Sequence, residues 1–86
     1  LWIKEKQPVD RVVLAEDLAY GQMVRSFAVE AWIGDRWQEV ARGSTIGYKR
    51  IVVFEPVETN RLRVEVLESI GPVRLKPMTA HFGGRR

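Results

Sequence analysis

Residues 61–66 read Arg-Leu-Arg-Val-Glu-Val, an alternation of polar and apolar side chains with a period of two. Successive side chains of a β-strand point to opposite faces, so Leu62, Val64 and Val66 would face a core while the charged residues face water. One-sided burial of this kind is typical of antiparallel sheets. The stretch therefore predicts a half-buried strand.

Working outward from this stretch, the same features recur along the chain. Residues 25–32 alternate in the same way, and residues 1–3 and 37–41 are short apolar-rich segments. Residues 9–15 and 51–54 are β-branched runs, which suit strands that are covered on both faces. The sequence therefore predicts six short strands.

Turn signals separate these strands. Gly34-Asp35 predicts a tight hairpin, and Gly71-Pro72 breaks the chain after the strand quoted above. Pro8 and Pro56 are expected at strand entrances, where no ladder N–H is lost. Short strands at a spacing of about ten residues are typical of sandwiches and barrels, so the predicted fold class is all-β.

Two segments are less regular. Residues 16–21 have room for a single helical turn at most. Residues 73–82 are expected to supply a closing strand, and Pro77 within them favours an edge position or a bulge. We therefore expect one sandwich domain over residues 1–82 and a flexible tail over residues 83–86.

Composition excludes several classes of protein. The 86 residues are enough for one core, and no apolar run approaches the length of a membrane-spanning helix. There is no cysteine, which removes disulfides, thiolate nucleophiles and cysteine-based zinc sites. The net charge of +3 is spread along the chain among acidic residues, so a mixed solvated surface is expected. Since the chain begins with Leu1 rather than methionine, we expect it to be a piece of a longer protein.

Three expected loops should lie at one end of the sandwich. Consecutive antiparallel strands place alternate connections at the same end, which brings together residues 16–23, 43–47 and 68–73. Loops on a rigid scaffold often carry binding residues, and tyrosines beside charged and amide groups can hold a sugar ring and its hydroxyls. The candidate carbohydrate-binding residues are Glu16, Asp17, Tyr20, Gln22, Tyr48, Lys49 and Glu68. In the alternative interpretation, Tyr20 and Tyr48 plug the end of the sandwich and the polar groups bond to loop backbone.

No catalytic constellation is visible. His81 is the one histidine, so neither a histidine-based metal site nor a Ser-His-Asp relay can form. Glu16 and Asp17 are adjacent, and neighbouring strand residues point to opposite faces, which is poor geometry for glycoside hydrolysis. Trp2, Trp32 and Trp37 are expected in the core, the last two pairing across the hairpin.

Two motifs, LAEDLAYGQ at residues 14–22 and GSTIGYKRI at residues 43–51, resemble the C-terminal β-sandwich domain of α-L-fucosidases. The resemblance extends over about residues 1–67. It implies a galactose-binding-like (discoidin-like) jelly-roll fold, here lacking its N-terminal strands. It also implies that catalysis belongs to a separate barrel domain, on which the sandwich packs.

The resemblance implies that this chain is a non-catalytic accessory module that binds fucose- or galactose-containing glycans or docks on the catalytic barrel. No cofactor is expected, although related sandwiches coordinate calcium through a part that precedes Leu1. The parent enzyme would be secreted, periplasmic or lysosomal.

Two other functions stay open. The first is a purely structural or oligomerisation module without a ligand, since an incomplete sandwich exposes an edge or an apolar patch that favours self-association. The second is a small nucleic-acid-binding β-barrel, which suits the basic composition but not the arrangement of aromatic and basic residues. No membrane partner is expected.

Overall fold

The computed structural model describes residues 1–83, apart from the side chains of Lys4 and Tyr20. Within this part the elements are β1 (Trp2–Leu14), η1 (Leu18–Tyr20), β2 (Val24–Ile33), β3 (Arg36–Gly43), β4 (Arg50–Ser69) and β5 (Thr79–His81). Of the tail expected at residues 83–86, positions 84–86 lie outside the described residues. The N–H of Gly83 donates to Asp10 Oδ1 at 3.0 Å.

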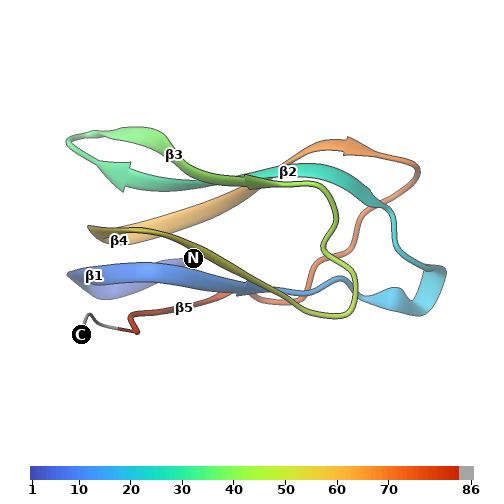
Figure 1. Ribbon diagram of the computed structural model, residues 1–86, viewed down its shortest axis with the longest axis horizontal. Helices are drawn as coiled ribbons and strands as arrows, with labels where there is room; N and C mark the ends of the chain where they lie inside the picture. Colours follow the sequence, from blue (N-terminus) through green and yellow to red (C-terminus); the bar gives the residue numbers. More distant parts are fainter. Residues whose placement is uncertain (84–86) are drawn as a thin grey trace.

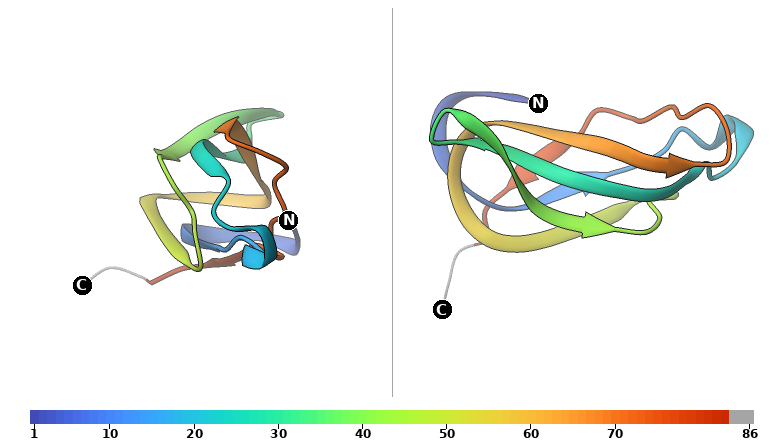
Figure 2. Two further views of the ribbon diagram at one scale, coloured as in Figure 1. Left: turned by 90° about the vertical axis from the view of Figure 1, so that its right-hand side faces the viewer. Right: turned by 90° about the horizontal axis from the view of Figure 1, so that it is seen from above.

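The strands are antiparallel and form two packed layers, which confirms the all-β sandwich (Figure 1). The first half of β4 pairs with β1, which also pairs with β5; we call this layer the β1 sheet. The second half of β4 pairs with β2, which also pairs with β3; we call this layer the β2 sheet. Figure 2 shows the two layers end-on in its left view.

β4 is one strand of 20 residues that passes from one layer to the other. The sequence predicted separate strands at residues 51–54 and 61–66, with Pro56 at a strand entrance, and that prediction is wrong. Pro56 is tolerated inside β4 because only β1 pairs with this half of the strand, which leaves the other edge free. Thr59 lies at the crossing, fully buried, and its hydroxyl donates to the carbonyl of Trp32 at 2.7 Å. β1 likewise continues through Pro8 and joins the two strands expected there.

The local turn predictions are confirmed. β2 and β3 form a hairpin in which Trp32 pairs with Trp37. Gly34 and Asp35 at its tip have φ values of 59° and 65°, the left-handed conformation that a two-residue hairpin turn requires. η1 is the single helical turn expected near Gly21.

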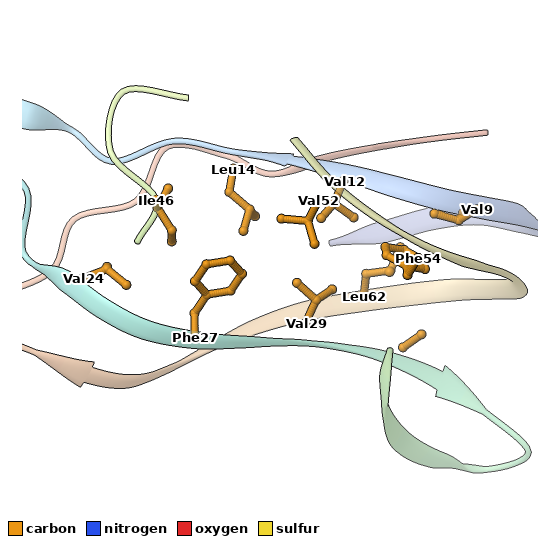
Figure 3. Packing of buried hydrophobic residues seen from close by; sticks show 11 residues of the cluster. Val9, Val12, Leu14, Val24, Phe27, Val29, Ile46, Val52, Phe54 and Leu62 are labelled. Carbon is orange, nitrogen blue, oxygen red and sulfur yellow. The ribbon is translucent and has the colours of Figure 1, made fainter. Parts of the chain in front are cut away.

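The core lies between the two sheets and consists of aliphatic side chains and two phenylalanines (Figure 3). Phe27 of β2 is fully buried and points toward the opposite layer, where Leu14 and Val52 lie. Leu62 fills the space nearer the β4 crossing. The buried cluster consists of Val9, Val12, Leu14, Val24, Phe27, Val29, Ala31, Ile46, Val52, Phe54 and Leu62.

The closing segment is shorter than expected. Residues 73–82 supply an isolated bridge between Leu75 and Glu16 and the three-residue β5, with Pro77 between them. β5 pairs only with β1 and is an edge strand, as the position of Pro77 favoured. β3 and β5 end the strand order β3-β2-β4-β1-β5 and do not pair, so residues 1–83 do not form the closed barrel of the nucleic-acid alternative.

Candidate functional site

Glu16 organises the end of the sandwich where the loops meet. Its side chain is 2% exposed and lies between two loops. Oε1 accepts from the N–H of Met23 at 2.8 Å and of Val24 at 3.3 Å, and Oε2 accepts from the N–H of Gly47 at 3.0 Å. The N–H of Glu16 also donates to the carbonyl of Gly47 at 2.8 Å. One carboxylate therefore ties both loops to the end of β1.

The third expected loop joins the same end. The N–H of Ile70 donates to the carbonyl of Met23 at 2.9 Å, and the N–H of Asp17 donates to the carbonyl of Arg74 at 2.8 Å. The three connections therefore converge as predicted, at the right-hand end of Figure 1. We call this end the loop rim; it comprises residues 16–23, 44–49 and 69–74.

The loop rim keeps Glu16 ionised. Burial raises the pKa of its carboxyl, but the three backbone N–H donors, with the charge of Arg25, outweigh burial and lower the pKa below its ordinary value. The carboxylate accepts these hydrogen bonds without carrying a proton of its own, so the ionised form is the one that fits this site. Glu16 therefore holds the loops in place, and both of its oxygens already accept hydrogen bonds from them.

Three of the predicted residues present exposed side chains around this anchor. Tyr48 is 75% exposed, and Gln22 and Lys49 are also exposed. Gln22 lies against Gly47, since a Cβ on that glycine would stand 3.3 Å from the Gln22 amide carbon. Gln22, Tyr48 and Lys49 therefore occupy the surface that Glu16 supports.

The other predicted residues are placed differently. Asp17 Oδ1 accepts from the N–H of Ala19 at 3.1 Å and caps η1. Glu68 is exposed near the end of β4, where it pairs with Ser26 of β2. The side chain of Tyr20 lies outside the described residues.

The structural alternative for this rim holds for part of it. Glu16 and Asp17 bond to loop backbone, as the structural alternative expected. Tyr48 does not plug the sandwich, because three quarters of it is exposed. Both oxygens of Glu16 are engaged by backbone N–H groups, so Glu16 and Asp17 do not present two free, facing carboxylates of the kind that a catalytic pair needs.

A stack of aromatic rings and arginines at the hairpin end was not expected. The Arg61 guanidinium lies 4.0 Å from the ring centre of Trp2 and 5.3 Å from that of Trp32. Trp32 meets Trp37 edge-on with ring centres 5.4 Å apart, and Arg63 lies 4.2 Å over Trp37. These distances suit cation–π contacts and an edge-to-face aromatic pair.

The tryptophans are therefore outside the core. Trp2 is 68% exposed, and Trp32 and Trp37 are half-buried on the outer face of the β2 sheet. The core assignment was wrong for all three, although the expected pairing of Trp32 with Trp37 is confirmed. The alternation of β2 indicated this position in the sequence, because Phe27, Val29 and Ala31 face inward and Trp32 must then face outward.

A hollow lies beside this stack, between the hairpin tip and the β4 crossing. Trp32 and Arg61 form part of its wall, and its edge carries charges of both signs and an amide. The polar lining residues are Lys6, Asp35, Glu58, Asn60 and Arg61. The Nε of Arg61 is buried and has no hydrogen-bond partner among the described residues.

Two kinds of feature are absent from residues 1–83. No three His, Asp or Glu side chains gather there in a way that would hold a metal ion; His81 bonds instead to Thr79, with Nε2 and Oγ1 3.0 Å apart. The one helix in this part of the chain has three residues, so no helix there could cross a membrane.

Comparison with known proteins points to a single group. No family model matches the sequence. The α-L-fucosidase 1 of Oryza sativa subsp. japonica is 38% identical over 72 residues, which are 84% of this chain but 13% of that protein. The chain therefore spans about an eighth of the curated relative that it matches.

Solved structures agree. An α-L-fucosidase from Bacteroides ovatus superimposes with a TM-score of 0.92 at 36% identity, covering 99% of this chain and 15% of that one. Another from Bacteroides thetaiotaomicron gives a TM-score of 0.88 at 35% identity, covering 93% and 19%. The homologues and structural neighbours of this chain are α-L-fucosidases, and it corresponds to a small β-sandwich portion of them.

Proposed function

We propose that this chain is a non-catalytic accessory module of an α-L-fucosidase and that it docks on the catalytic domain of the same enzyme. The length of this chain relative to its homologues supports the proposal, because fucosidases match most of the chain while the chain covers only 13% to 19% of them. The part of those fucosidases that this chain does not cover is long enough for a catalytic barrel. A supporting role for the sandwich is also consistent with Glu16, both of whose oxygens accept from backbone N–H groups of the loops.

Deletion of the module from its enzyme tests this function. We expect the unfolding temperature to fall by at least about 5 °C, because docking stabilises both partners. The turnover of a simple aryl fucoside by the molecules that remain folded should change by less than about threefold, a barrier change of under about 0.7 kcal/mol. A loss of turnover of about a hundredfold in folded enzyme would mean that the sandwich contributes a catalytic group.

A second candidate function is contact with glycan at the loop rim. Gln22, Tyr48 and Lys49 support it, because they are exposed on a surface whose backbone is fixed by the buried Glu16. A rigid backbone lowers the entropy lost on binding. An exposed tyrosine ring suits the apolar face of a sugar, and the amide and ammonium groups suit its hydroxyls.

A titration of the ¹⁵N-labelled chain with fucose- and galactose-terminated oligosaccharides tests this candidate. We expect amide shifts confined to residues 16–23 and 44–49, with millimolar affinity, about −4 kcal/mol. Tyr48→Ala should abolish them, whereas Tyr48→Phe keeps the ring and should retain most of the effect. Saturating shifts at the hairpin end instead would move the glycan site to the hollow beside Trp32.

A further inference from the structure

The two outer faces of the sandwich differ in chemistry. The outer face of the β2 sheet carries paired charges, one pair between β4 and β2 and one pair within β3. Arg63 Nε lies 2.6 Å from Glu30 Oε1, and an Arg42 nitrogen lies 2.7 Å from Glu39 Oε1. Paired, exposed charges of this kind suit a face in contact with water.

The outer face of the β1 sheet carries aliphatic side chains at its centre. Ile51 and Val53 of β4 are 52% and 62% exposed. Ile51 pairs with Val13 of β1, which is half-buried and lies on the same face. These three side chains form one continuous apolar surface across two strands.

The two halves of β4 differ in the chemistry of their outward-facing side chains. In its second half, inward Leu62 alternates with outward Arg63 and Glu65, as a half-exposed strand requires. In its first half, inward Val52 alternates with outward Ile51 and Val53, which is the pattern of a strand covered on both faces. Within residues 1–83, one of those faces has no cover.

Two of the polar groups that border this surface are already paired. Arg11 Nε donates to Asp10 Oδ1 at 2.9 Å, and His81 bonds to Thr79. A partner could therefore cover the aliphatic centre without leaving Arg11 as an unpaired buried charge. An apolar centre with a polar border is the usual composition of an interface.

We propose that the outer face of the β1 sheet, centred on Val13, Ile51 and Val53, is the surface by which the module docks on the catalytic domain of its own enzyme. This inference rests on the proposed function. The occupant follows from the comparisons, in which the chain covers 13% to 19% of a much longer polypeptide. Covalent linkage gives that partner a high effective concentration, so a modest apolar surface suffices.

A binding experiment in trans tests the surface. The 86-residue chain is titrated onto the enzyme from which the module has been deleted. Ile51→Lys and Val53→Lys should each weaken binding at least about tenfold, or about 1.4 kcal/mol, because each places an ammonium in the apolar interface. Both sites are exposed, so the thermal unfolding of the isolated variants should stay within about 2 °C of the parent chain.

Leu67→Lys is the matched control. Leu67 is an aliphatic residue of the same strand, 42% exposed, and lies in the half of β4 that pairs with β2. Its substitution should change the affinity by less than about twofold, or about 0.4 kcal/mol. Weaker binding by Leu67→Lys with no effect at Ile51 and Val53 would overturn the inference and leave the docking function standing.

Hydroxyl-radical footprinting of the intact enzyme covers the case in which the separated parts do not associate. We expect oxidation of Ile51 and Val53 to fall at least about threefold relative to the isolated chain, with Leu67 unchanged, because docking removes the first two from water. Equal oxidation of Ile51 and Val53 in both samples, with protection elsewhere in the module, would overturn this surface alone. If no part of the module is protected, the docking function fails as well.

Discussion

At the scale of single residues, Glu16 determines the shape of the loop rim. Its buried carboxylate accepts from backbone N–H groups of two loops and so gives these donors a hydrogen-bond partner. The exposed positions of Gln22 and Tyr48 depend on it. Glu16 is therefore a positioning residue for whatever the rim binds.

Glu16→Gln should destabilise the isolated chain by about 1–3 kcal/mol at neutral pH. The amide has one acceptor oxygen, and its NH₂ group would face the N–H of Met23 or Gly47. Urea unfolding followed by circular dichroism measures the change. Glu68→Gln, an exposed site on β4, serves as the control and should shift stability by less than about 0.5 kcal/mol.

The direction in which stability changes with pH follows from the pKa of Glu16. The pKa of Glu16 is lowered in the folded chain from an ordinary value of 4.5, so its contribution is complete above that pH and is lost as the pH falls through the folded value. The parent chain should therefore lose more stability than Glu16→Gln between about pH 5 and pH 3. Parallel curves for the two proteins would show that Glu16 is not the group responsible.

Residue types at the loop rim were foreseeable, but their roles were not. Acidic and amide side chains in converging loops indicate a polar site. Whether a given carboxylate faces solvent or the backbone depends on distances between segments as far apart as Glu16 and Gly47, and these are set only when the loops pack. Glu16 and Tyr48 therefore looked alike in the sequence and differ in the structure.

At the scale of elements, the close approach of β2 and β3 depends on a glycine. Gly43 pairs with Phe27, and a Cβ at position 43 would stand 2.6 Å from the Phe27 ring, which is fully buried. Gly43→Ala should therefore destabilise the chain by about 1–3 kcal/mol through displacement of the ring. Urea unfolding measures this change.

The double variant isolates the cause. In a Phe27→Leu background the ring is absent, so Gly43→Ala should cost at least about 1 kcal/mol less than in the parent chain. An undiminished cost in that background would place the strain in the β3 backbone instead of against the ring.

The strands themselves were foreseeable where alternation is strong. Residues 61–66 lie within β4 with the predicted inward face, because side-chain direction in a strand follows from sequence parity. Joining of predicted strands through Pro8 and Pro56 was not foreseeable. It depends on those prolines facing unpaired strand edges, which is a property of the sheet and not of the local sequence.

At the scale of the whole molecule, the sandwich has one charged outer face and one apolar outer face. The β-branched runs at residues 9–15 and 51–54 already indicated strands covered on both sides. Figure 1 shows that the β2 sheet covers only one side of them. Figure 1 also shows β4 running from one layer to the other, which lets a single strand contribute to both outer faces.

The sequence alone determined the all-β class, the Gly34-Asp35 hairpin and the inward face of each strong strand, because these follow from backbone conformation and from a two-residue period. The tertiary structure decided the crossing of β4, the outward Trp–Arg stack and the burial of Glu16. Each of these depends on contacts between residues distant in sequence, and such contacts exist only once the two sheets have packed.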